Sequence, residues 1–226
     1  MTNTWTGERV LGDRMVSALG FGCWAIGGPF SDRQGRPLGW GEVDDDESVR
    51  AVHAGLDLGV TFFDTSDAYG TGHSETVLGR ALAGRRDRVV IASKWGNVID
   101  PERRMLVGED ASVGYVRRAL AGTLARLGTD YLDLYQLHIG PSVQDAEALR
   151  AECDDLVREG LVRGYAWSTD DPERAAAFAA GEHCTAVQHE LSVLHDAPEI
   201  LELCERRGIA SVNRTCLLYT SPSPRD

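Results

Sequence analysis

Residues 44–63 read DDDESVRAVHAGLDLGVTFF, and this stretch contains the unit from which the fold is built. Its first part has acidic residues, which stabilise the start of a helix, and then apolar residues at helical spacing: Val49, Val52 and Leu56. Gly59 provides the left-handed backbone that commonly ends a helix. The β-branched and aromatic residues that follow, Val60–Phe63, predict a strand. The unit is therefore a helix, a glycine and a strand.

The same unit recurs through most of the chain. A glycine separates an amphipathic segment from a strand-forming segment at five positions: Gly59, Gly84, Gly128, Gly160 and Gly208. Six helices are predicted, at residues 44–58, 74–83, 116–127, 149–157, 172–180 and 198–207. Seven strands are predicted, at residues 19–24, 60–63, 88–92, 131–137, 162–167, 185–194 and 209–212. Such alternation is typical of a parallel sheet with helices packed outside it.

This count predicts the fold class. A closed (β/α)8 TIM barrel typically has about 250 residues, so we expect an α/β protein with an incomplete barrel, about one and a half units short. Residues 8–11 and 15–19 flank Gly12-Asp13, which predicts a β-hairpin before the barrel. A doubly wound open sheet is the alternative fold.

Two helix starts are predicted from aspartate and proline. Asp171 precedes Pro172, which suits the first position of a helix because its missing N–H needs no partner there. The stretch Asp196-Ala197-Pro198-Glu199 resembles a capping box. We therefore expect Asp171 and Asp196 to cap the last two helices.

The composition excludes several classes of protein. The 226 residues are 42% hydrophobic, which is enough to fold, and they include no apolar run of about 18 residues that would span a membrane. The 35 acidic and 23 basic residues give a charge of −12, which disfavours a nucleic-acid partner. The N-terminus lacks the pattern of a signal peptide, and the five cysteines form no Cys-x-x-Cys pair. We therefore expect a cytoplasmic protein with reduced thiols and no metal, and we interpret His183, Cys184 and His189 as a loop cluster.

Polar side chains stand at the ends of three successive predicted strands. The stretch FFDTSDAYG, residues 62–70, contains Asp64 and Tyr69, while Lys94 and His138 end the next two strands. The carboxyl ends of parallel strands meet on the active face of a barrel, so these four side chains are expected to converge.

The chemistry of the four residues is complementary. A tyrosine with a reference pKa of about 10 is a poor acid, and a nearby ammonium lowers that pKa. The aspartate can hold the lysine charged, and the histidine can bind a substrate oxygen. Together they could protonate a carbonyl oxygen while a hydride arrives at the carbon.

With these four residues in this order, the chain resembles the aldo-keto reductases from about Arg9 to Arg214. The resemblance implies an oxidoreductase that reduces a small-molecule aldehyde or ketone to an alcohol with NADPH, or less often NADH. It implies that Tyr69 is the general acid, that Lys94 and Asp64 tune it, and that His138 orients the carbonyl. The resemblance also implies cofactor-binding residues: Gly22, Cys23, Trp24, Asp64, Ser168, Thr169, Gln188 and Arg214.

Two of these positions depart from the family pattern. Thr169 stands where the family has the asparagine of a Ser-Asn pair, and Arg214 stands where many members have an aromatic ring. The alternative function is a nicotinamide-binding regulatory or redox-sensing subunit with little turnover. The sequence leaves open the carbonyl substrate, the choice between NADPH and NADH, and the oligomeric state.

The last stretch of the chain breaks the pattern. Residues 215–226, TCLLYTSPSPRD, resemble the translation of an adapter used in DNA library preparation. We therefore expect residues 1–214 to be a truncated reductase-like barrel and residues 215–226 to be a non-native tail. Because an unclosed barrel exposes two strand edges, we expect the chain as given to be poorly stable and an inactive fragment.

Overall fold

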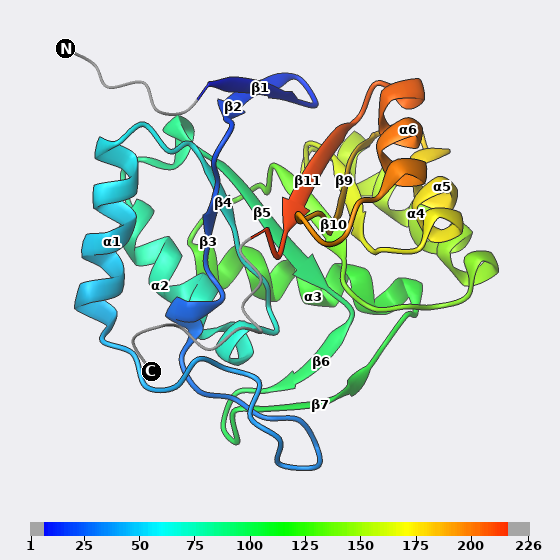
Figure 1. Cartoon of the computed structure of the whole chain (residues 1–226). Helices are drawn as coiled ribbons and strands as arrows, with labels where there is room; N and C mark the ends of the chain where they lie inside the picture. Colours follow the sequence, from blue (N-terminus) through cyan, green and yellow to red (C-terminus); the bar gives the residue numbers. More distant parts are fainter. Residues whose placement is uncertain (1–6, 217–226) are drawn as a thin grey trace.

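The computed structural model describes residues 7–216, and its centre is a curled sheet of parallel strands (Figure 1). The seven strands are β3 (Phe21–Gly22), β4 (Phe62–Asp64), β5 (Val90–Trp95), β8 (Leu134–Leu137), β9 (Tyr165–Ser168), β10 (Cys184–Glu190) and β11 (Ala210–Arg214). They lie in the order β11-β10-β9-β8-β5-β4-β3, which follows the chain without a reversal. A doubly wound sheet reverses its order at a switch point, so that alternative is wrong. All but two residues of the proposed tail, 215–226, lie outside the described part.

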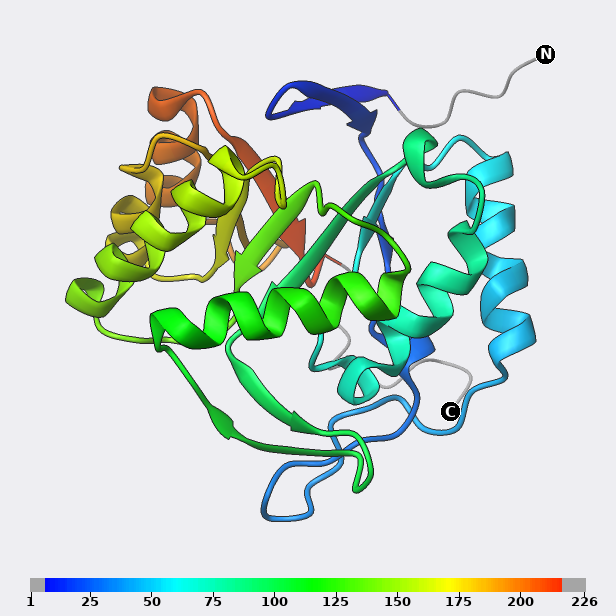
Figure 2. The same cartoon turned by 180° about the vertical axis from the view of Figure 1, so that it is seen from behind.

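Six helices connect successive strands and lie on the outer face of the curled sheet (Figures 1 and 2). They are α1 (Asp45–Asp57), α2 (His73–Leu82), α3 (Val113–Leu127), α4 (Val143–Arg158), α5 (Pro172–Ala179) and α6 (Pro198–Arg207). These elements are most of a (β/α)8 barrel, so the predicted fold class is confirmed. Within residues 7–216, none of the helices combines the length and the apolar character needed to cross a bilayer.

The glycines at the helix ends have the backbone that the repeat predicts. All five have a positive φ, between 65° and 90°: Gly59, Gly84, Gly128, Gly160 and Gly208. This conformation costs a residue with a Cβ free energy, whereas glycine adopts it readily. Each helix can therefore end and turn toward the next strand within a few residues.

The two faces of the sheet bury different partners. Outward-facing side chains such as Phe63, Ile91 and Trp167 pack in one large core with the helices. Inward-facing positions in the lower part of the barrel are mostly small or apolar: Phe62, Val90, Ala92, Leu134, Ala166, Ala186 and Ala210. Two residues further along five of these strands, where side chains face inward again, the residues are polar: Asp64, Lys94, Gln136, Ser168 and Gln188. In β11 the polar residue is Arg214, four residues after Ala210. The carboxyl end of the barrel is thus built for polar chemistry.

A hairpin closes the opposite end of the barrel. The strands β1 (Glu8–Leu11) and β2 (Arg14–Ser17) pair in antiparallel register, as predicted. Leu11 and Val16 are buried against the lower inner layer, which includes Phe62 and Val90. The hairpin therefore fills the amino-terminal mouth and leaves the other mouth for the site.

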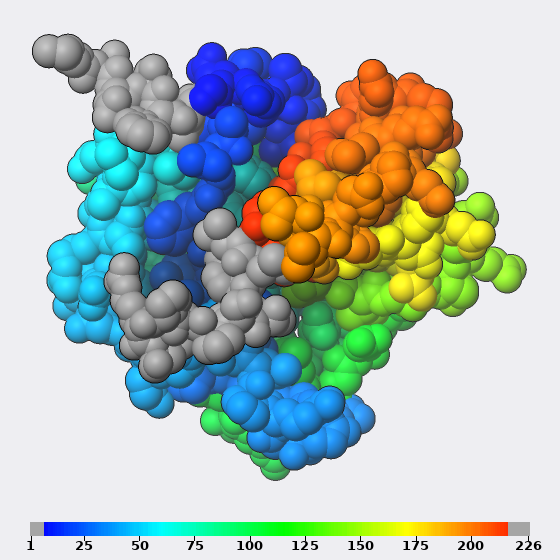
Figure 3. All heavy atoms as spheres, viewed as in Figure 1, coloured from blue at the N-terminus to red at the C-terminus, as the bar shows by residue number. Residues whose placement is uncertain are grey.

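A second hairpin was not predicted from the sequence. The strands β6 (Asn97–Asp100) and β7 (Met105–Glu109) extend from the end of β5 beside the loop of residues 28–42 (Figures 1 and 3). Two backbone hydrogen bonds join them to that loop, from Ser31 N to Arg104 O at 3.0 Å and from Leu106 N to Ser31 O at 2.9 Å. These two segments form a wall beside the carboxyl end of the barrel.

The two predicted aspartate caps have different outcomes. The Asp171 carboxylate accepts hydrogen bonds from Glu173 N and Arg174 N, and Pro172 opens α5 as predicted. The predicted capping box at Asp196 is wrong, because Ala197 is the N-cap of α6 and no side chain caps the helix. Asp196 lies one residue too far from Pro198 to reach the first free N–H groups.

This contrast gives a stability prediction. Replacing the capping residue, in Asp171→Ala, is expected to lower the free energy of unfolding by about 1 kcal/mol. The matched control Asp196→Ala is expected to change it by less than about 0.5 kcal/mol. Urea denaturation of both variants measures the difference, and equal losses would contradict the assignment of the caps.

Candidate active site

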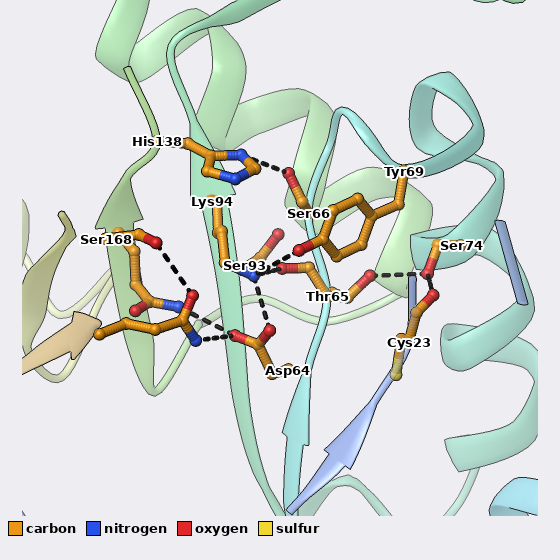
Figure 4. Close-up of polar contacts among 12 residues, drawn as sticks. Cys23, Asp64, Thr65, Ser66, Tyr69, Ser74, Ser93, Lys94, His138 and Ser168 are labelled. Carbon is orange, nitrogen blue, oxygen red and sulfur yellow. Dashed lines mark hydrogen bonds and ion pairs between the residues drawn. The ribbon is translucent and has the colours of Figure 1, made fainter. Parts of the chain in front are cut away.

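Figure 4 shows polar side chains gathered at the carboxyl end of the barrel, with Lys94 at their centre. Lys94 is 1% exposed, and its ammonium donates to three oxygens. The distances from Nζ are 2.7 Å to Asp64 Oδ2, 2.9 Å to the Thr65 carbonyl and 3.2 Å to the Tyr69 hydroxyl. A buried ammonium is costly unless its protons find such partners. The structure therefore brings together three of the four predicted catalytic residues in direct contact.

The second oxygen of Asp64 is held by two amides from other strands. Gln136 Nε2 and Gln188 Nε2 each donate to Asp64 Oδ1 at 3.0 Å. Ser168 Oγ then donates to Gln188 Oε1 at 3.1 Å. Gln136 was missed by the sequence analysis, although it precedes the predicted His138 by two residues and so faces the same side of the strand. The carboxylate is thereby fixed by β5, β8 and β10 at once.

Tyr69 lies in a tight turn after β4, in which Gly70 has a φ of 59°. A Cβ on Gly70 would lie 1.9 Å from Gly27 O, so the loop after β3 and the loop after β4 touch backbone to backbone. The Tyr69 ring stacks on Trp24, with centroids 5.9 Å apart, and Lys94 Nζ lies 4.8 Å from the ring centroid. The turn and the stack together direct the phenol toward Lys94.

The pKa of Tyr69 differs from the expectation that the Lys94 ammonium would lower it. Burial raises the pKa of Tyr69, and this effect outweighs the Lys94 ammonium, which lowers the pKa. Burial alone would lower the pKa of Lys94, but Asp64 and Tyr69 more than offset it, so the lysine pKa is raised. At neutral pH the pair is a protonated phenol beside a charged ammonium.

His138 lies beside this group without joining its hydrogen bonds. Its ring is edge-on to the Tyr69 ring, with centroids 6.0 Å apart, and its Nδ1 lies 3.3 Å from Ser66 Oγ. Burial, followed by the charges of Lys94 and Arg214, lowers the pKa of His138 to about 3. The imidazole is therefore neutral at pH 7.

Behind these residues lies a buried group of carboxyls that the sequence analysis also missed. Glu75 is fully buried, and it accepts hydrogen bonds from Arg126 Nε at 2.6 Å and from Ser93. Asp67 is 2% exposed and contacts Ser66. Ser66 and Asp67 stand inside the stretch that contains Asp64 and Tyr69, which was the available signal.

The predicted cofactor-binding residues lie in different environments. Gly22 pairs with Asp64 in the sheet, and a Cβ there would meet no atom within 4 Å, so open space adjoins Asp64. The Cys23 thiol is buried in the outer core, and it lies close enough to the site for Asp64 and Lys94 to act on its pKa. The Thr169 hydroxyl accepts a hydrogen bond from Asp171 N at 3.1 Å. Arg214 forms an ion pair with Asp170.

The interpretation of His183, Cys184 and His189 as a loop cluster is wrong for two of the three, because Cys184 and His189 are buried residues of β10. The two histidines also have separate partners. His183 Nδ1 lies 3.0 Å from Asp154 Oδ1, and His189 Nε2 lies 2.8 Å from Ser211 Oγ. In the part of the chain that the structure describes, no three His, Cys, Asp or Glu side chains are arranged to hold a metal ion.

Comparison with solved structures shows the same architecture. The holo form of aldo-keto reductase AKR11C1 from Bacillus halodurans matches with a TM-score of 0.82 and 30% identity, over 97% of this chain and 70% of that one. An aldo/keto reductase from Klebsiella pneumoniae, solved in complex with NADP and acetate, matches with a TM-score of 0.70 and 29% identity, over 91% of this chain and 66% of that one.

Comparison with known sequences agrees. The "Uncharacterized oxidoreductase YqkF" of Bacillus subtilis is 28% identical over 210 residues, which are 92% of this chain and 63% of that protein. The chain spans between 47% and 63% of the length of the first curated relatives that it matches. The model of the "Aldo/keto reductase family" matches residues 18–221. Sequence, fold and the polar group at the barrel mouth therefore agree that the chain belongs to the aldo/keto reductase family.

Proposed function

We propose that the protein reduces an aldehyde or ketone to an alcohol with NADPH or NADH. The observation that carries the proposal is the position of the Tyr69 hydroxyl, 3.2 Å from an ammonium that Asp64 holds at 2.7 Å. This geometry places a protonated phenol at the open end of a barrel, next to a cation that favours its conjugate base. The relative from Klebsiella pneumoniae that was solved with NADP and acetate supports the choice of cofactor.

The residues present fit a nicotinamide at this mouth. The side chains of Ser168 and Gln188 offer a hydroxyl and an amide, which complement the donor and acceptor of a carboxamide. The open space at Gly22 lets a planar group approach the strand end beside Asp64. Arg214 offers a planar guanidinium that can stack on a ring. These residues and Trp24 are the ones we propose to hold the cofactor.

In the proposed mechanism, a reduced nicotinamide held by these residues would supply the hydride that the carbonyl carbon accepts. Tyr69 donates its phenolic proton to the carbonyl oxygen as negative charge develops there. Lys94 stabilises the resulting phenolate, and Asp64 keeps the lysine charged. The neutral His138 forms a hydrogen bond with the carbonyl oxygen and orients it.

We further propose that residues 1–214 are the reductase part of a longer cytoplasmic protein and that residues 215–226 are foreign to it. The lengths of the curated relatives support the first point, and the free thiols of all five cysteines support a reducing compartment. Sequencing the source DNA beyond the codon for Arg214 is expected to reveal a further strand and helix. A stop codon directly after Asp226 would contradict this proposal.

Replacing Tyr69 tests the general acid. Tyr69→Phe is expected to lower kcat for carbonyl reduction by at least about 100-fold, because the proton donor is lost, and to leave cofactor affinity largely unchanged. The control is Tyr135→Phe, because the Tyr135 hydroxyl donates to Val116 O at 3.3 Å on the outer face of the sheet.

Turnover and cofactor binding are measured in the product of the complete gene and in the 226-residue chain. Unchanged turnover in Tyr69→Phe would overturn the role of this residue. Cofactor binding by the wild-type protein without turnover on a panel of aldehydes and ketones would favour the regulatory subunit instead.

The pKa of Tyr69 gives a separate test. Burial raises this pKa above the ordinary value of about 10 for a phenol, so the phenol stays protonated, and able to donate, throughout the neutral range. The difference between the ultraviolet titrations of the wild type and Tyr69→Phe isolates this group. Removing the ammonium in Lys94→Met is expected to raise the pKa further, because the cation favours the phenolate. A titration below pH 10 in the wild type would contradict the prediction.

A further inference from the structure

A short chain of hydrogen bonds runs from His138 away from the catalytic mouth. His138 Nδ1 lies 3.3 Å from Ser66 Oγ (Figure 4), and Ser66 Oγ lies 3.3 Å from Asp67 Oδ1. The backbone N–H of Ala68 also donates to Ser66 Oγ, at 3.1 Å. Ser66 is fully buried and Asp67 is 2% exposed, so water does not compete for these contacts.

The Ser66 hydroxyl can complete its hydrogen bonds in two ways. It has one proton to donate and two lone pairs, and Ala68 N–H occupies one lone pair. If Asp67 is ionised, the hydroxyl donates to Asp67 and accepts from a protonated Nδ1 of His138. If Asp67 is protonated, the carboxyl donates to the hydroxyl, which then donates to a bare Nδ1. Which ring nitrogen of His138 bears the proton therefore depends on whether Asp67, two hydrogen bonds away, is protonated.

We infer that Asp67, acting through the Ser66 hydroxyl, fixes the tautomer of His138 in which Nδ1 is bare and Nε2 bears the proton. Both residues are positioning residues, because neither reaches the mouth of the barrel. The inference deepens the proposed function and rests on it only for its consequence in catalysis.

The surroundings of Asp67 favour its protonated form. Within residues 7–216, no Lys, Arg or His side chain forms an ion pair with Asp67. Arg126, the cation whose charge acts on Asp67, forms an ion pair with Glu75 at 2.6 Å. The other ionisable groups that interact with Asp67 are Tyr115 and Tyr135. Burial, followed by the charge of Glu75, raises the pKa of Asp67 well above its ordinary value.

The consequence concerns the substrate. Within residues 7–216, His138 Nε2 has no hydrogen-bond partner, and His138 is only partly buried, so this nitrogen is free to meet a ligand. A carbonyl oxygen only accepts hydrogen bonds, and therefore it needs an N–H and not a bare nitrogen. With the proton on Nε2, the ring can orient the carbonyl oxygen near the Tyr69 hydroxyl. With the other tautomer, two lone pairs would face each other.

The tautomer can be measured directly with the full chain labelled with 15N in histidine. The two ring nitrogens of a neutral imidazole have different chemical shifts according to which one is protonated. In the wild type at pH 7, the ratio of the Nε2–H form of His138 to the Nδ1–H form is expected to be roughly fivefold higher than in a solvent-exposed neutral histidine, the increase that a net hydrogen bond provides. The measurement needs no cofactor and no turnover.

Three variants assign the cause. Ser66→Ala removes the donor to Nδ1 and is expected to lower the ratio to that of a solvent-exposed neutral histidine. Asp67→Asn is expected to preserve the wild-type ratio, because the amide N–H can donate to Ser66 Oγ as the carboxyl does. The control is Ser74→Ala, an equally buried serine whose hydroxyl contacts Thr65 and the Cys23 carbonyl instead; it is expected to leave the His138 signals unchanged.

The outcomes separate this inference from the proposed function. A wild-type His138 that is protonated on Nδ1, or a tautomer ratio that Ser66→Ala leaves unchanged, would overturn the inference while leaving the role of Tyr69 intact. If Ser66→Ala does not fold, the wild type and Asp67→Asn decide the question by themselves. If the tautomer follows Ser66 and yet no carbonyl is reduced by the product of the complete gene, the proposed function fails and the inference stands.

Discussion

The site depends on one buried charge. Taking an ammonium such as that of Lys94 out of water costs several kcal/mol, and removing the partner of a buried ion typically costs about 3–5 kcal/mol. Lys94 is accepted at 1% exposure because Asp64, a backbone carbonyl and a phenol accept its protons. Asp64 in turn accepts from the amides of Gln136 and Gln188. The requirement to satisfy one cation therefore fixes the relative positions of four strands and of the Tyr69 turn.

Much of the fold could be predicted because its signals are local. A glycine between an amphipathic segment and a strand-forming segment predicts the end of a helix from a few neighbouring residues. All five such glycines have the expected positive φ. Asp171 could be predicted as a cap because it directly precedes a proline, whereas the same prediction for Asp196 was wrong, because α6 begins at Pro198 and Ala197 is its N-cap. The hairpin of β6 and β7 was missed because its turn, with Arg104 at a φ of 50°, contains no glycine.

The site residues that stand at strand ends could be predicted from the sequence. The residues that contact the site only through another side chain could not. Asp64, Tyr69 and Lys94 were predicted to converge because parallel strands end on one face. Gln136 contacts Asp64 and Asp67 contacts Ser66, and a sequence does not show which polar side chain reaches another. The pKa of Tyr69 was also beyond sequence reasoning, since its direction depends on how far burial exceeds the effect of Lys94.

The contact between Gly27 and Gly70 has a consequence for how such a protein can diversify. A Cβ on Gly70 would lie 1.9 Å from Gly27 O, and a Cβ on Gly27 would lie 2.8 Å from the Tyr69 carbonyl carbon. Neither glycine can be replaced by a larger residue without moving the loop that contains Tyr69. Substitutions at Gly27 and Gly70 would therefore have to occur together or not at all. New substrate preferences would therefore have to arise elsewhere, in segments free of this restriction. The hairpin of β6 and β7 is such a segment, and so is the loop of residues 28–42 apart from Gly39, where a Cβ would lie 2.2 Å from Gly28 O. Changes in these two segments would reshape the walls beside Tyr69 without moving its turn.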